Sequence, residues 1–102
     1  MEINTVTITG YIATEIDVDS LRKTSTGTSV INFNMACEKE NNQNEADFIK
    51  CTAYGKIAEN ILKYIKKGSH VVIEGRVCSN VYQDDQQVNH YETYIYIKKI
   101  RF

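Results

Sequence analysis

The chain has 102 residues, a formal net charge of −1, 42% hydrophobic residues and 25% charged residues. A chain of this length forms one domain with one core, so we expect a single unit over residues 1–102. The near-neutral charge excludes a protein that is basic throughout, and no apolar run is long enough to cross a membrane. The N-terminus, MEINTVTITG, alternates and does not resemble a secretory signal, so we expect a cytoplasmic protein.

The first part of the chain predicts two long strands. Residues 3–14 alternate, are rich in Thr and β-branched side chains, and contain Gly10, which marks a bend or a close backbone approach. Residues 30–37 alternate again and follow a turn built around Gly27. That turn is short enough to form a hairpin with the short basic piece 21–23.

The third predicted strand carries the strongest functional signal. It follows residues 38–45, EKENNQNE, which contain no apolar side chain and predict a solvated, mobile loop. One face of the strand is small and apolar, formed by Ile49, Cys51 and Ala53. The opposite face interleaves two rings with a cation and a hydroxyl, in the order Phe48, Lys50, Thr52, Tyr54. Such a face suits single-stranded nucleic acid, although a second hydrophobic layer or a subunit contact is the alternative.

The last part of the chain predicts one helix and two strands. Apolar residues recur at helical spacing over 56–67, and strands follow at 69–82 and 88–100, joined by the polar tip QDDQQ. In the first of these strands one apolar face is expected, formed by Val71, Ile73, Val77 and Val81, with Gly75 at a bend.

The element order predicts a closed sheet. One helix cannot cover both faces of an open five-stranded sheet, so closure into a barrel buries the apolar faces better. We therefore predict an all-β fold with one helix, namely a five-stranded OB-fold barrel with the helix between strands 3 and 4. OB-folds bind oligonucleotides or oligosaccharides across their second and third strands, and the strand with the two rings is the third.

The cysteines and histidines give no sign of a metal, cofactor or catalytic site. Cys37, Cys51 and Cys78 are odd in number and far apart, and His70 and His90 lie in predicted strands without a close ligand partner. We therefore expect reduced cysteines that pack as small apolar groups, with no metal and no cofactor. A cysteine nucleophile would need a base beside it, so we do not expect an enzyme.

Several motifs, taken in order along the chain, resemble the bacterial single-stranded DNA-binding protein family. The most specific combination is ADFIKCTAYGKIAEN followed by KGSHVVIEGRV. The matching pieces cover nearly the whole chain and are Asn4-x-Val6-x-Ile8-x-Gly10, Leu21-Arg22, Val30-x-x-Phe33, Ala46 to Ile49, Tyr54 to Glu59, Lys67 to Val71, Glu74 to Val77 and Tyr82.

The resemblance implies a non-catalytic protein that protects exposed single-stranded DNA in replication, recombination and repair. It implies stacking rings on strands 3 and 4, basic residues that pair with phosphates, and self-association, most often as a homotetramer with a homodimer as the alternative. The candidate nucleic-acid-binding residues are Phe48, Tyr54, Tyr82, Lys50, Arg76, Lys23 and Lys56.

The chain also departs from the pattern of this family. It has no tryptophan, so Tyr and Phe occupy the ring positions. It ends with the predicted barrel, whereas the family continues into a disordered segment with an acidic tip, so recruitment of proteins through such a tail is not expected. Two alternatives fit this pattern, a compact member of the kind that phages, plasmids or mobile elements carry and a family member from which the tail has been removed.

Other functions remain open on the sequence alone. The near-neutral charge is compatible with an OB-fold replisome adaptor of the primosomal type, in which the aromatic face docks a protein. Arg76 can pair with Glu74 or Glu92 instead of phosphate, and the acidic tip beside Tyr82 disfavours phosphate there. The tyrosines of the closing strand are expected in the barrel wall or a subunit contact, and they are Tyr91, Tyr94 and Tyr96.

Overall fold

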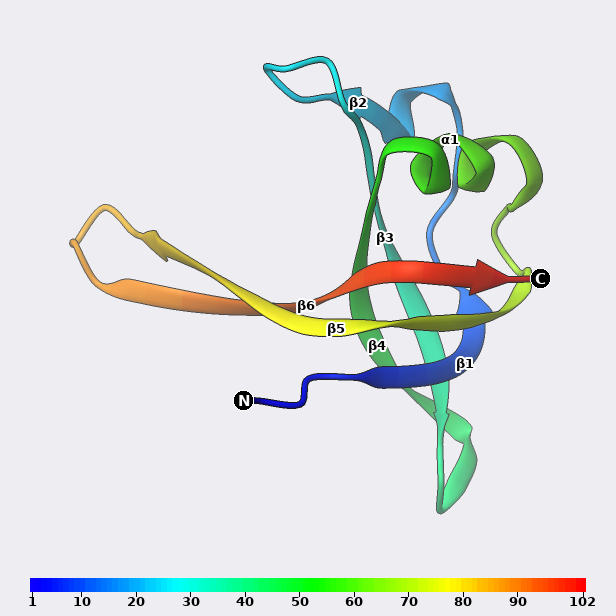
Figure 1. Cartoon of the computed structure of the whole chain (residues 1–102). Helices are drawn as coiled ribbons and strands as arrows, with labels where there is room; N and C mark the ends of the chain where they lie inside the picture. Colours follow the sequence, from blue (N-terminus) through cyan, green and yellow to red (C-terminus); the bar gives the residue numbers. More distant parts are fainter.

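The strands close into a barrel. The computed structural model describes all residues 1–102. Its elements are β1 (Val6–Ile12), the 3₁₀ turn η1 (Val18–Ser20), β2 (Leu21–Lys23), β3 (Ser29–Lys39), β4 (Asn42–Tyr54), α1 (Gly55–Tyr64), β5 (His70–Gln83) and β6 (Asn89–Arg101). The sheet order is β1-β5-β6-β4-β3-β2, and β1 also pairs with β3. That last pairing closes five strands on themselves and confirms the predicted OB-fold barrel with one helix (Figure 1).

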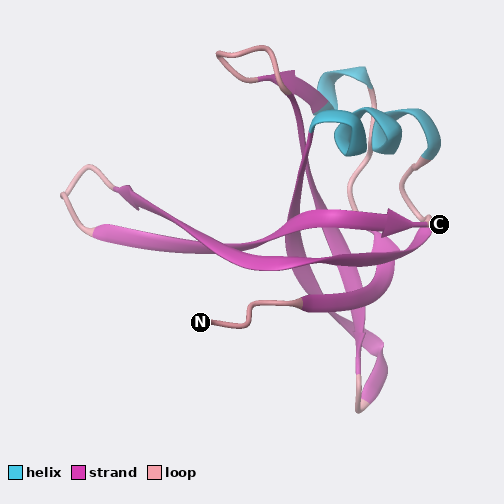
Figure 2. Cartoon of the chain, in the orientation of Figure 1, coloured by secondary structure: helices cyan, strands magenta, loops and turns pink.

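The barrel interior is filled by the faces that the alternating pattern predicts. In β4 the small residues Cys51 and Ala53 are fully buried, which lets the neighbouring strands curl closely around them. The helix α1 covers one end of the barrel (Figure 2), and its residues Ala58 and Ile61 are buried in the core. The buried core consists of Ile12, Ile31, Phe33, Met35, Cys51, Ala53, Ala58, Ile61, Ile65, Val71, Ile73, Ile95 and Ile97.

Two glycines lie where strands approach each other too closely for any side chain. A Cβ on Gly10 would lie 2.5 Å from the carbonyl oxygen of Ala36, and one on Gly75 would lie 2.0 Å from that of Tyr96. Gly75 also lies where the β5–β6 register shifts, because Glu74 pairs with Lys99 but Gly75 pairs with Ile97. The predicted bend or close approach at Gly10 is confirmed, and Gly75 occupies a β-bulge.

The predicted loop over residues 38–45 is wrong. β3 continues to Lys39 and β4 begins at Asn42, so this segment is the exposed end of a hairpin with a short turn. The period-2 signal is absent there because both faces of the hairpin are solvated, and the strands are held together by backbone hydrogen bonds and by the surface ion pair between Lys39 and Asp47. An alternating sequence pattern appears only where one face of a strand is buried, and neither face of this hairpin end is buried.

The helix is shorter than predicted. It ends at Tyr64 instead of Lys67, because the backbone of Ile65 is extended, with φ −115° and ψ 142°. This conformation turns the Ile65 side chain into the core, where it is 3% exposed. Burial of this one β-branched residue therefore ends the helix before Lys66 and Lys67. No helix of the structure is long and apolar enough to cross a membrane.

The β5–β6 hairpin extends well beyond the barrel (Figure 1). The expected apolar face of β5 is therefore divided: Val71 and Ile73 are fully buried, whereas Val77 is 44% exposed and Val81 is 57% exposed. The alternation of β5 was predicted correctly, but burial over its whole length was not. The outer half of the hairpin keeps a core-like face with nothing in this chain to cover it.

Candidate nucleic-acid interface

The outward face of β4 presents the two predicted rings to solvent. The Phe48 side chain is 71% exposed and that of Tyr54 is 38% exposed. Lys50 and Thr52 lie between them on the same face of the strand. Thr52 is 5% exposed and its hydroxyl donates a 2.6 Å hydrogen bond to Asn32 Oδ1 on β3, which fixes the middle of this face. The arrangement provides exposed rings on a rigid, hydrogen-bonded strand.

The neighbouring strand β6 extends this face with two further tyrosines. The parallel pairing of β4 with β6 places Tyr96 opposite Thr52, and the Tyr96 ring stacks on Tyr54 with centroids 5.6 Å apart and an interplanar angle of 27°. Arg76 on β5 pairs with Tyr96 in turn, and Tyr94 lies two residues along the same face. Tyr94 and Tyr96, which were expected in the barrel wall or a subunit contact, lie on the outer barrel face that carries Tyr54.

Sequence reasoning missed these tyrosines because the β4–β6 register is a long-range property. The alternation over residues 88–100 does show that Tyr94 and Tyr96 share a face. It does not show which strand lies beside them. In the structure, burial raises the pKa of the Tyr94 phenol, and the nearby Cys78 and Tyr54 raise it further. The Tyr94 hydroxyl therefore stays protonated well above neutral pH.

Lys50 is held by a carboxylate on the same surface. Its Nζ lies 2.6 Å from Glu92 Oε1 on β6. Arg76, for which Glu92 was one expected partner, forms no ion pair in the structure. A hollow of about 150 Å³ opens beside Lys50 and is lined by the polar residues Thr14, Asn32 and Asn34 together with Phe33.

Tyr82 lies at the far end of the β5–β6 hairpin and is 54% exposed. Its ring stacks on the ring of its cross-strand partner His90, with centroids 5.2 Å apart and an interplanar angle of 18°. The Nε2 atom of His90 lies 2.7 Å from Asp84 Oδ2. His90, together with backbone N–H groups of the tip, holds the pKa of the Asp84 carboxyl below its usual value. The tip is therefore an ordered turn with an anionic residue beside the Tyr82–His90 pair.

Lys23 and Lys56 lie outside the outward face of β4. Lys23 Nζ donates a 2.8 Å hydrogen bond to Ser29 Oγ, which is buried and in turn donates to Glu59 on the helix. This network lies on the opposite face of the strands from the rings. Lys56 is exposed in the first turn of α1, two residues after Tyr54. The structure thus places Phe48, Lys50 and Tyr54 on one face of β4 with Arg76 across β6 from them, whereas Tyr82 lies apart at the end of the hairpin.

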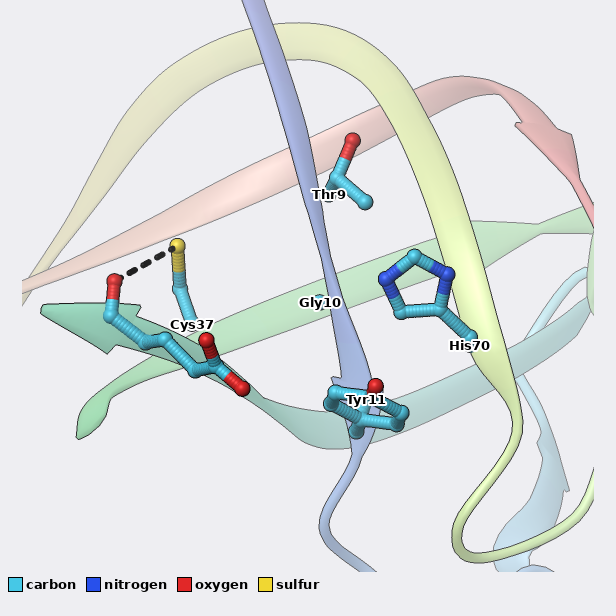
Figure 3. A pocket seen from close by; sticks show the side chains of 6 residues that line it. Thr9, Gly10, Tyr11, Cys37 and His70 are labelled. Atoms are coloured by element: carbon cyan, nitrogen blue, oxygen red, sulfur yellow. Dashed lines mark hydrogen bonds between the residues drawn. The ribbon is translucent and has the colours of Figure 1, made fainter. Parts of the chain in front are cut away.

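A second hollow, of about 250 Å³, lies elsewhere on the barrel (Figure 3). Side chains from β1, β3 and β5 surround it, and the Tyr11 and His70 rings lie 4.6 Å apart there, tilted by 48°. Glu38 lines the same hollow, and none of the candidate residues does. Its carboxylate makes this hollow a poor place for a phosphate.

The three cysteines are free, and they differ in burial. Cys51 is fully buried in the core, and this burial raises the pKa of its thiol from 9.0 to about 12. Cys37 and Cys78 are partly exposed. The thiolate is the nucleophilic form, so Cys51 is chemically inert at neutral pH. The structure holds no group of three or more His, Cys, Asp or Glu side chains that could bind a metal ion.

Thiol labelling distinguishes these cysteines. In the native protein we expect a thiol reagent to modify Cys37 and Cys78 at an ordinary rate and to leave Cys51 unmodified until the chain unfolds. The reason is that Cys51 combines full burial with a pKa about three units above its ordinary value. Peptide mass spectrometry of samples labelled with and without denaturant measures this. Rapid labelling of Cys51 in the folded protein would contradict the burial described here.

Comparisons with known proteins agree with the geometry. The model of the single-strand binding protein family matches residues 3–102. The chain is 33% identical to single-stranded DNA-binding protein B of Bacillus subtilis over 103 residues, covering 97% of this chain and 88% of that protein. It is 38% identical over 82 residues to single-stranded DNA-binding protein 1 of Clostridium acetobutylicum, covering 76% of this chain and 74% of that protein.

A third relative is longer than this chain. Single-stranded DNA-binding protein 2 of Listeria monocytogenes is 32% identical over 104 residues, and the match covers 98% of this chain but 63% of that protein. The family match spans the whole barrel, including the β4 face and the β5–β6 hairpin. The chain therefore belongs to the single-strand binding protein family.

Proposed function

We propose that this protein binds single-stranded DNA with little sequence preference by stacking bases on the outward face of β4. The observation that carries the proposal is the exposed pair Phe48 and Tyr54 on one strand face, with Lys50 between them and Arg76 nearby. Every base has a flat face, so stacking of this kind does not select a sequence. The relatives named above are called single-stranded DNA-binding proteins, which supports the same ligand. Roles in DNA replication, recombination and repair follow from that ligand.

The charges on this face predict that base stacking contributes more to the free energy of DNA binding than ion pairing does. Lys50 is paired with Glu92, which leaves Arg76 as the cation of this face without an ion pair. Stacking on an aromatic side chain contributes about 1–3 kcal/mol per base. A protein with a net charge of −1 depends on stacking for its DNA affinity more than a basic protein does.

Fluorescence anisotropy of a labelled oligo-dT strand tests the proposal directly. The label is needed because the chain has no tryptophan. We expect saturable binding that weakens with salt by roughly 0.7 in log affinity per log salt for each phosphate contact, and much weaker binding to a duplex of the same length. A chain that does not bind the single strand at low salt, or that binds the duplex equally well, would contradict the proposal.

The proposal extends to assembly, location and activity. A homotetramer is proposed, with a homodimer as the alternative, because the core-like face of the β5–β6 hairpin exposes Val77, Val81 and Tyr91. Sedimentation at several protein concentrations measures this, and a monomer at every concentration would contradict it.

A cytoplasmic location and the absence of catalysis are proposed on the ligand, since binding by stacking requires no reaction.

The adaptor alternative has no support. Each relative named above is called a single-stranded DNA-binding protein, and none is called an adaptor. The outward face of β4 also combines rings with Lys50, and the polar Asn32 and Asn34 of the neighbouring β3 lie beside it, a mixture suited to bases and phosphates.

A further inference from the structure

The one cation between the stacking rings already has a partner in the protein. Lys50 Nζ and Glu92 Oε1 lie 2.6 Å apart, and the side chains are 39% and 41% exposed. Glu92 projects from β6 on the same face as Tyr94 and Tyr96, which lie two and four residues later in the strand. Glu92 therefore lies within the proposed binding face and not at its edge.

The rest of the Lys50 environment is uncharged. The hollow beside it is lined by Thr14, Asn32, Phe33 and Asn34, which offer hydroxyl and amide groups but no second carboxylate. The ammonium of Lys50 is thus held by Glu92 alone. A phosphate that approaches between Phe48 and Tyr54 meets this ion pair before it meets a free cation.

We propose that Glu92 sets the affinity and the salt dependence of this site by competing with DNA phosphate for Lys50. The inference rests on the proposed function, because it assumes that the strand crosses β4 between the two rings. An ion pair that is about 40% exposed is weak, so phosphate displaces the carboxylate instead of being blocked by it. Glu92 is an affinity-determining residue that acts through Lys50.

The competition has a thermodynamic signature. When a phosphate pairs with a free lysine, the DNA releases a condensed cation, and this release produces the salt dependence. When phosphate displaces Glu92 instead, salt also screens the exposed Lys50–Glu92 pair, so the competing carboxylate holds Lys50 less strongly as salt rises and this offsets part of the salt dependence. Lys50 in the wild-type protein therefore adds less to the salt slope than a free lysine would. Removal of the Glu92 charge restores its full contribution of roughly 0.7 in log affinity per log salt.

Glu92→Gln tests the proposal in the oligo-dT assay at a series of salt concentrations. We expect this variant to bind about threefold to fivefold more tightly than wild type at low salt and to show a salt slope that is steeper by up to roughly 0.7. Glu40→Gln is the matched control, because Glu40 is exposed in the β3–β4 turn, forms no ion pair, and its substitution changes the net charge equally. Glu92→Thr, a residue suited to strands, repeats the test if the Gln variant fails to fold.

The double variant Lys50→Gln, Glu92→Gln tests whether Glu92 acts through Lys50. If Glu92 acts through Lys50, this double variant loses both the added affinity and the added slope. If it keeps them, Glu92 acts only by general repulsion and the proposal is overturned. A Glu92→Gln variant that behaves like Glu40→Gln, while wild type binds the strand, also overturns it. Failure of wild type to bind oligo-dT would instead reject the proposed function.

Discussion

Replacing both exposed rings of β4, in the double variant Phe48→Ala, Tyr54→Ala, is expected to reduce affinity for oligo-dT by at least about thirtyfold. Each ring that stacks on a base contributes about 1–3 kcal/mol, so two rings contribute about 2–6 kcal/mol. The side chains are 71% and 38% exposed, so their truncation opens no large cavity in the barrel. The salt slope is expected to change little, because no charge is removed. Anisotropy titrations at several salt concentrations measure both quantities.

The chain offers a control that removes the same two kinds of ring elsewhere. Tyr64 and Phe102 stack with centroids 6.0 Å apart, and they are 56% and 67% exposed. Tyr64 lies on α1, and neither residue belongs to β4. The variant Tyr64→Ala, Phe102→Ala is expected to bind oligo-dT within about threefold of wild type. Equal losses in the two double variants would show that binding has no preference for the β4 face.

The second large effect is on stability. Gly75→Ala is expected to lower the free energy of unfolding by about 3 kcal/mol, at the upper end of the usual cost of overpacking. The added Cβ would lie 2.0 Å from the carbonyl oxygen and 3.0 Å from the carbonyl carbon of Tyr96. Both are backbone atoms within a paired strand, so relief requires β5 and β6 to separate at the bulge. Urea unfolding followed by circular dichroism measures the loss.

Gly27→Ala provides the comparison for this prediction. A Cβ on Gly27 would meet no atom within 4 Å, and its cost comes only from the left-handed backbone with φ +87°. That cost is about 1–2 kcal/mol. Gly75→Ala is therefore expected to be clearly more destabilising than Gly27→Ala. If the two variants unfold at the same urea concentration, the close approach of β5 and β6 does not exist as described.

The fold was largely predictable from the sequence because its signals are local. Alternation in residues 30–37 and 47–54 identifies the core faces, and glycine in the middle of a strand marks a close approach. The β3–β4 hairpin end was missed because neither of its faces is buried there. The end of the helix was missed because packing of Ile65, a tertiary effect, determines it.

The candidate site was predictable only along single strands. Phe48, Lys50 and Tyr54 share a face by alternation, and the structure agrees. The Tyr54–Tyr96 stack and the Lys50–Glu92 pair depend on the parallel register between β4 and β6, strands separated by the helix and by β5. No local sequence pattern indicates the register between β4 and β6. Tyr96 and Glu92 were therefore identified only in the structure. Phe48, Lys50 and Tyr54 were identified from the sequence.

Photocrosslinking of a 5-bromouracil-substituted single strand, followed by mass spectrometry of the crosslinked peptides, tests the central claim most directly. Excited bromouracil attacks aromatic side chains that lie against the base, so the crosslinked residue reports the stacking partner. The account predicts crosslinks to Phe48 and Tyr54 on β4, which disappear in the double variant. Crosslinks confined to Tyr11 beside the second hollow, or to Tyr64 and Phe102, would place the strand elsewhere and contradict the account.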